Sequence, residues 1–98
     1  MVLTSKQRSY LKSIAQKTES IFQIGKNGLT PDVTEAVGQA LDARELVKIS
    51  VLQNCLEDPR DMAERLAERT KSLVVQVIGK KIVLYKPAKK NPKITLAE

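Results

Sequence analysis

Residues 19–41, with the sequence ESIFQIGKNGLTPDVTEAVGQAL, contain the signals that decide the fold. The first six are rich in strand formers and stop at Gly25, which predicts a strand over residues 19–24. Thr30 followed by Pro31 is typical of a helix start, because threonine caps the first turn and proline fits the first helical position. Apolar residues then repeat at helical spacing as far as Leu41. The stretch therefore predicts a strand, a glycine loop and a helix in direct succession.

Similar signals on either side predict two more helices and three more strands. Thr4 or Ser5 can cap the first helix, and Asp58-Pro59 opens the last one. Residues 46–52 alternate apolar and polar side chains, as a strand with one buried face does. The additional elements are helices over about residues 5–17 and 59–70 and strands over residues 46–52, 73–78 and 82–86, the last two joined as a hairpin at Gly79-Lys80.

The order α-β-α-β-α-β-β predicts an α/β (α+β) fold in two layers, with a four-stranded mixed sheet. Polar residues interrupt the apolar strands at alternate positions: Gln23, Lys48, Ser50 and Gln76. If they share one face, only the other face of the sheet is fully covered. We predict one domain over residues 1–86. Residues 87–98 lose periodicity and are interpreted as a basic, flexible tail, of which residues 94–96 could dock on the domain.

Charge is distributed unevenly along the 98 residues, whose net charge is +6. Residues 1–31 carry five cations and one anion, residues 32–68 four cations and nine anions, and residues 69–98 eight cations and one anion. If the two basic ends meet in the fold, they form a positive face that suits a polyanion. The alternative is that the charge serves solubility alone.

The cellular setting is predicted from what the sequence contains. Cys55 is the one cysteine, so a disulfide framework is not expected and a reducing cytoplasm is. The first residues are charged where a signal peptide is apolar, and no apolar run reaches the length of a membrane span. We therefore expect a cytoplasmic protein that does not meet the membrane, and a monomer, since no long apolar face is left over after packing.

The loop Gly25-Lys26-Asn27-Gly28 is the candidate binding site. Glycines allow a sharp turn, its amides and the start of the following helix can hold an anion, and Lys26 adds a cation at the tip. A nucleoside triphosphate is not expected, because the trailing lysine and hydroxyl residue of a nucleotide loop are missing. The plain alternative is a tight turn in which Asn27-Gly28 tolerates positive φ. Basic residues that could extend an RNA-binding surface are Lys6, Arg8 and Lys12 on the first helix and Lys80 and Lys81 at the hairpin.

Catalysis is not expected from this composition. The chain has no histidine, and a lone cysteine with scattered carboxylates does not make a metal site. Cys55 is interpreted as a small thiol at the edge of the core. Asp58 is interpreted as a helix cap, and Glu57 and Asp61 as acids favoured by the helix dipole. No catalytic residue, metal or cofactor is predicted.

Three segments carry a resemblance to a known family: LTSKQRSYLKSIA at residues 3–15, IFQIGKNGLT at residues 21–30 and ALDARELVKISVL at residues 40–52. They resemble the CRM domain (chloroplast RNA splicing and ribosome maturation), most of all its small single-domain bacterial YhbY-like members, over about residues 2–86. The resemblance implies a fold like the C-terminal domain of a bacterial translation initiation factor. It also implies RNA binding through Gly25, Lys26 and Gly28, and association with ribosomal RNA in precursors of the large (50S) ribosomal subunit.

A second hypothesis is a protein-interaction adaptor in ribosome assembly or translation. The third predicted helix carries Glu64 and Glu68 on its outer surface and could meet a basic ribosomal protein. RNA binding should weaken steeply with salt and depend on Lys26, whereas protein binding should depend on the two glutamates. Because the chain has three aromatic residues, Tyr10, Phe22 and Tyr85, base stacking is not expected to dominate, and the backbone should be recognised first.

Overall fold

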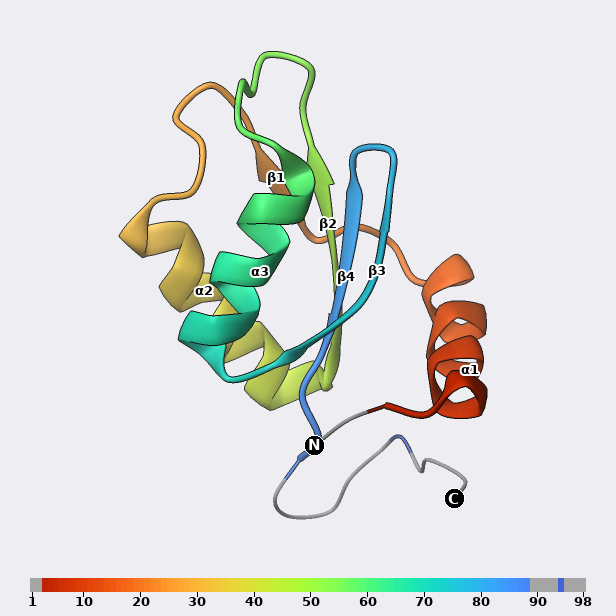
Figure 1. The fold of residues 1–98 in the computed structure, drawn as a ribbon. Helices are drawn as coiled ribbons and strands as arrows, with labels where there is room; N and C mark the ends of the chain where they lie inside the picture. The colour runs from red at the N-terminus through yellow and green to blue at the C-terminus, as the bar shows by residue number, and fades with distance from the viewer. Residues whose placement is uncertain (1–2, 89–93, 95–98) are drawn as a thin grey trace.

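The computed structural model describes residues 3–88 and residue 94. It has three helices and a four-stranded mixed sheet in the predicted order, which confirms the α+β fold class (Figure 1). The helices are α1 (Ser5–Gln16), α2 (Pro31–Arg44) and α3 (Pro59–Thr70). The strands are β1 (Phe22–Ile24), β2 (Leu46–Val51), β3 (Leu73–Ile78) and β4 (Lys81–Tyr85).

The predicted caps start all three helices. Thr4, rather than Ser5, caps α1, and it exchanges hydrogen bonds with Gln7 as a capping box. The Thr30 hydroxyl accepts the Val33 N–H at 3.2 Å, and Asp58 accepts the Arg60 N–H at 3.1 Å. These side chains satisfy amides that have no partner within the helix, so each helix begins where the sequence indicates.

The sheet has the strand order β1-β2-β4-β3. β1 pairs with β2 in parallel, and β4 is antiparallel to both β2 and β3. β4 therefore lies between two strands that precede it in the sequence. The register places Gln23 opposite Ser50 and places Val83 opposite both Lys48 and Gln76. This confirms that the polar strand residues share one face, because paired positions point to the same side of a sheet.

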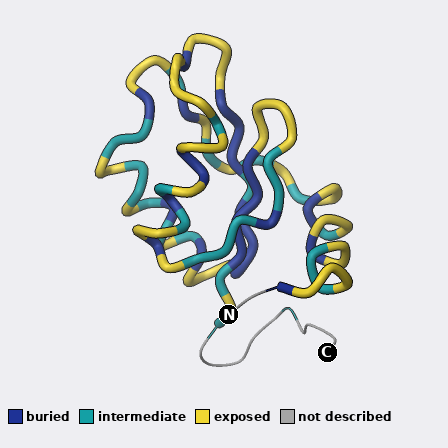
Figure 2. The backbone as a smooth tube through the Cα atoms, viewed as in Figure 1, coloured by how far each residue is buried: buried dark blue, intermediate teal, exposed yellow. Residues whose placement is uncertain are grey.

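Helices α2 and α3 cover the other face. Their buried residues Val37, Leu41 and Leu66 pack against strand residues that include Ile49 and Leu84. Figure 2 shows the buried backbone concentrated in the central strands. Cys55 is a buried free thiol at the margin of this cluster, as predicted. This cluster is the larger of the two described cores. Because β1 and β2 are parallel, the loops that follow them leave the sheet at the same end.

Helix α1 covers part of the polar face. Leu11 and Ala15 pack there against Leu46, Val75 and other residues of a second core cluster. The residues of this face are less exposed to solvent than the polar positions in the sequence suggest. Ser50 is only 8% exposed, and the Lys48 ammonium donates to the Ala15 carbonyl at the end of α1 at 3.2 Å. The long Lys48 side chain thus adds to the cover that α1 provides on this face of the sheet.

Two local expectations change or are extended. β1 is shorter than the predicted 19–24, because pairing with β2 begins at Phe22, although the Ile21 N–H still donates to the Lys48 carbonyl at 3.1 Å. Most of the predicted tail lies outside the described residues. Ile94 is described: it packs against the second core cluster and donates its N–H to the Glu45 carboxylate at 3.4 Å.

Over the described ranges, none of the helices has the length and apolarity to cross a membrane.

Candidate nucleic-acid interface

The Gly25–Gly28 loop is a tight turn closed by its own backbone. The Gly28 N–H donates to the Gly25 carbonyl at 2.9 Å, and Gly28 has φ +66°. L-residues rarely adopt that conformation, which explains a glycine at the end of the turn. A Cβ on Gly25 would lie 3.2 Å from Asn54 Oδ1, so the neighbouring segment packs closely against the start of the turn. The backbone conformation therefore accounts for Gly28, and the close approach of Asn54 favours glycine at position 25.

Two backbone amides at the tip remain available. Within the described part of the chain, the N–H groups of Lys26 and Asn27 make no hydrogen bond, and both side chains are exposed. Two adjacent amides beside an ammonium group form a small site of positive potential. The expectation that the amides of this loop would be free is thus correct for Lys26 and Asn27. It is wrong for Gly28, whose amide closes the turn.

The Leu29 amide is held by a carboxylate from a distant part of the chain. Leu29 N–H donates to Glu57 Oε2 at 3.1 Å, and Arg65 Nη2 lies 3.2 Å from the same oxygen. A Cβ on Gly28 would lie only 2.7 Å from Glu57 Oε2. Glu57 therefore braces the turn from the segment that precedes α3. Sequence reasoning assigned Glu57 only to the helix dipole, since no local pattern connects it with a loop 28 residues earlier.

The contacts of Glu57 with Leu29 and Arg65 predict that the conformation of the turn depends on pH. The hydrogen bond from the Leu29 amide holds the pKa of Glu57 below its ordinary value, and the Arg65 guanidinium lowers it further. A carboxyl group whose pKa falls on folding stabilises the fold above its unfolded pKa, and this contribution is lost as the pH falls through the lowered value. We expect the Leu29 amide resonance to titrate with a midpoint below that of an unperturbed glutamate. NMR spectra over an acid titration would measure it.

A Glu57→Gln variant is the control for this titration, because it keeps the shape of the side chain and removes the ionisation. The Leu29 resonance of that variant should lose the transition. A wild-type midpoint at the ordinary glutamate value would contradict the bracing of the loop by Glu57.

Two of the other predicted basic residues, Lys12 and Lys81, lie on the polar face of the sheet. Lys12 of α1, Lys81 of β4 and Lys48 of β2 line an open hollow on the face of the sheet that α1 partly covers. Lys80 is exposed at the hairpin tip, and its carbonyl accepts the Val51 N–H at 2.7 Å. Lys6 is exposed in the first turn of α1. Lys48 was not among the residues expected to bind, although its alternation in β2 placed it on this face.

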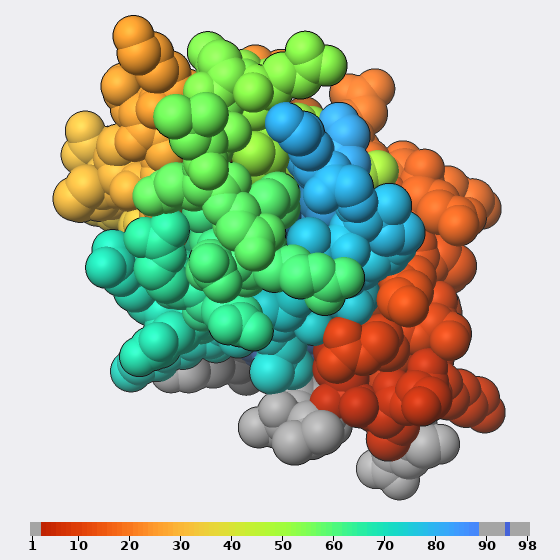
Figure 3. Space-filling model, turned by 45° about the horizontal axis from the view of Figure 1, so that its top comes forward, coloured from red at the N-terminus to blue at the C-terminus, as the bar shows by residue number. Residues whose placement is uncertain are grey.

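The glycine loop and the hollow are separated by the chain between β2 and α3. In Figure 3 that segment, in green, lies between the orange loop after β1 and the blue β3–β4 hairpin. Helix α1, whose basic residues could have extended the surface of the glycine loop, does not lie beside that loop. Its apolar residues pack on the polar face of the sheet, whereas the loop leaves the edge strand β1 (Figure 1). The basic ends of the chain therefore meet around the hollow and not around the loop.

Arg8 has a structural role in this arrangement. Its Nη1 donates to the carbonyls of Val74 and Val75 at 2.8 and 2.7 Å. The register of β3 against β4 shifts at this place, and such irregularities leave backbone groups without a partner in the sheet. Arg8 thus fastens α1 to β3, so its substitution would destabilise the fold as well as remove a charge.

Comparison with known proteins gives consistent matches along nearly the whole chain. The model of the CRS1 / YhbY (CRM) domain matches residues 3–86. "Probable RNA-binding protein YqeI" of Bacillus subtilis is 48% identical over 95 residues, which cover 97% of this chain and 99% of that protein. An "RNA-binding protein" of Haemophilus influenzae is 34% identical over 86 residues, 88% of this chain and 87% of that one.

A solved structure shows the same fold. The solution structure of hypothetical protein SAV1595 from Staphylococcus aureus, described there as a candidate RNA-binding protein, superposes with a TM-score of 0.82 at 45% identity, covering 98% of this chain and all of that one. Because the family model matches residues 3–86 and the solved structure has the same fold, the chain belongs to the CRS1 / YhbY (CRM) domain family.

Proposed function

We propose that this chain binds RNA by holding the phosphate backbone at the GKNG turn, that the RNA is ribosomal, and that the protein acts in assembly of the large ribosomal subunit. The observation that carries the proposal is the exposed turn, in which two free amides lie beside the Lys26 side chain. The relatives named above as RNA-binding proteins support the ligand class. The resemblance of the sequence to the CRM domain supports ribosomal RNA as the ligand. A cytoplasmic monomer without enzymatic activity remains part of the proposal.

The turn suits a phosphate better than a base. Amide N–H groups and an ammonium group are donors that phosphate oxygens accept, and they carry no information on base sequence. Glu57 already occupies the Leu29 amide, so the site available to the ligand is confined to the tip at Lys26 and Asn27. A rigid turn with this small donor set positions one phosphate group.

Replacing Lys26 by alanine should weaken binding of every RNA sequence alike and reduce the dependence of log affinity on log salt by about one. Fluorescence anisotropy of several RNA oligonucleotides, each at several salt concentrations, would measure both effects. Arg44→Ala is a matched control, since Arg44 is an exposed cation at the far end of α2. Losses that depended strongly on base sequence would contradict phosphate binding at the turn.

The ribosomal role is tested by sedimentation of tagged protein from cell lysate at low and moderate salt. Wild-type protein should migrate with large-subunit precursors, and a folded variant carrying Lys26→Asp and Asn27→Asp should not. Equal migration of both proteins with the precursors would exclude the turn as the anchor. It would favour the alternative of protein contacts through α3, where Glu64 and Glu68 are exposed. If both proteins remain at the top of the gradient, the assembly role is wrong.

A further inference from the structure

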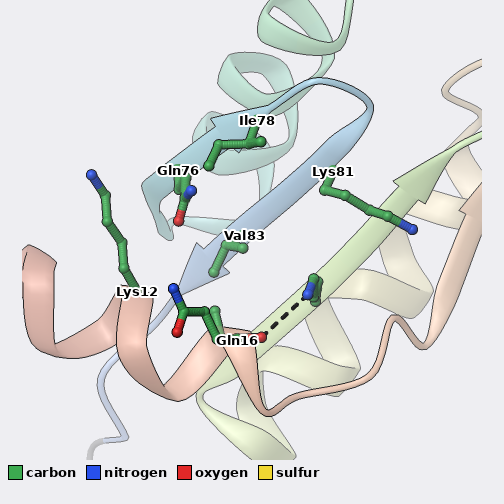
Figure 4. A pocket seen from close by; sticks show the side chains of 8 residues that line it. Lys12, Gln16, Gln76, Ile78, Lys81 and Val83 are labelled. Carbon is green, nitrogen blue, oxygen red and sulfur yellow. Dashed lines mark hydrogen bonds between the residues drawn. The ribbon is translucent and has the colours of Figure 1, made fainter.

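The open hollow beside α1 is lined by three basic residues, Lys12, Lys48 and Lys81. It has a volume of about 170 Å³ and is lined by side chains from α1, β2, β3 and β4 (Figure 4). A cavity of ~150 Å³ is large enough for a single six-membered ring. The lining contains no acidic side chain. Its size and charge therefore suit part of a nucleotide.

The floor of the hollow is apolar. Ala15 and Val83 are buried in the second core cluster, whereas Ile78 at the end of β3 is 60% exposed although it is a large apolar residue. The exposed apolar surface of Ile78 can cover part of one face of a ring, and its exposure to water is unfavourable without a partner. The ligand should therefore offer an apolar face to Ile78 and Val83.

Two amide side chains provide specific polar contacts. Gln16 of α1 and Gln76 of β3 line the side of the hollow that faces Lys12, as Figure 4 shows. Neither side-chain amide makes a hydrogen bond to another described residue. An amide group has both a donor and an acceptor, which matches the edge of a nucleobase better than it matches a phosphate. The hollow thus combines an apolar floor with groups able to recognise a base edge.

The lysines are arranged around the rim and do not converge on one point. The ammonium groups of Lys12 and Lys81 point away from each other in Figure 4. Lys48 donates to the Ala15 carbonyl, and Lys81 donates to the Ser50 hydroxyl, so both side chains are positioned and keep further N–H donors. A single inorganic anion would need converging cations. Separated cations suit the successive phosphates on either side of one base.

We propose that the hollow receives one unpaired nucleobase of the bound RNA, with its face on Ile78 and Val83, its edge at Gln16 and Gln76, and its neighbouring phosphates near Lys12 and Lys81. The inference rests on the proposed RNA binding and makes it more specific: the ligand includes a single-stranded nucleotide in addition to the backbone held by the turn. Unstacked bases in loops and single strands are the parts of RNA that proteins can recognise in this way.

The first test is an NMR titration of isotope-labelled protein with uridine 5′-monophosphate, adenosine 5′-monophosphate and ribose 5-phosphate. The nucleotides should shift the resonances of Gln16, Gln76 and Val83, and ribose 5-phosphate should not. Equal shifts with all three compounds would show a phosphate site without base recognition and would overturn the proposal.

The second test uses a neutral substitution, so that charge is unchanged. Gln76→Leu should weaken binding of single-stranded RNA about fivefold, alter the preference among bases and leave the salt dependence as it is. Gln39→Leu on the exposed surface of α2 is the matched control. Equal affinities of these two variants, without nucleotide-induced shifts, would overturn the base site.

The outcomes separate this inference from the proposed function. If nucleotides shift the resonances of the hollow while Lys26 substitutions leave RNA affinity unchanged, the base site is supported and the turn is not the phosphate site. If Lys26 substitutions weaken RNA binding while no nucleotide shifts the resonances of the hollow, the proposed function is supported and the base site is wrong.

Discussion

Replacing Gly28 by alanine is expected to lower the free energy of unfolding by about 1–3 kcal/mol and to weaken RNA binding about tenfold. Two effects add. The residue has φ +66°, which an L-residue adopts only with strain. In addition, the new Cβ would lie 2.7 Å from Glu57 Oε2, so the carboxylate that braces the turn must move away from the Leu29 amide. Urea unfolding followed by circular dichroism, and RNA anisotropy at fixed salt, would measure the two losses.

Gly79→Ala is the matched control for this substitution. Gly79 has φ +53°, and a Cβ there would meet no atom within 4 Å, so the variant experiences backbone strain alone. We expect a smaller loss of stability than in Gly28→Ala. Combining Gly28→Ala with Glu57→Ala should reduce the excess, because it removes the atom that collides. Equal losses for the two glycines would show that the Glu57 contact is unimportant, and unchanged RNA affinity of Gly28→Ala would argue against the turn as a binding site.

Replacing Leu84 by alanine should have the largest effect on stability, a loss of about 2–5 kcal/mol. Leu84 is fully buried in the larger core cluster, and it lies on β4 between Val47 of β2 and Val74 of β3. Its truncation would leave a cavity where two strands and the covering helices meet. Small domains are typically stable by ~5–15 kcal/mol, so the midpoint of urea unfolding should fall markedly.

Leu56→Ala is the control for the core substitution, since the same chemical change is made at a residue that is 98% exposed. Its free energy of unfolding should stay within about 0.5 kcal/mol of the wild type. A loss from Leu56→Ala as large as that from Leu84→Ala would mean that the segment before α3 is packed differently from the structure. Near-equal stability of Leu84→Ala and wild type would refute the central position of β4 in the core.

Structural features that depend on neighbouring residues could be predicted from the sequence. Thr30-Pro31 and Asp58-Pro59 define helix starts because capping is a local interaction, and Gly25 to Gly28 define the turn because its backbone conformation is local. The shared polar face of the strands followed from alternation, and the register confirmed it. The fold class was predictable for the same reason.

Features that depend on distant residues could not be predicted in this way. Glu57 reaches Leu29 across 28 residues, and Arg8 reaches the irregularity in β3 across 66. Neither contact leaves a repeating pattern in the sequence. The position of α1 also depends on distant residues: its basic side chains could have extended the surface of the glycine loop, whereas the packing of Leu11 and Ala15 places α1 on the polar face of the sheet.

The central position of β4 also constrains how the protein is made. During synthesis, β2 and β3 emerge before the strand that joins them, so each has an unpaired edge until residues 81–85 have left the ribosome. The hollow cannot form earlier, since β4 supplies part of its floor and rim. A nascent chain therefore acquires this surface in one late step, when insertion of a single strand closes the sheet.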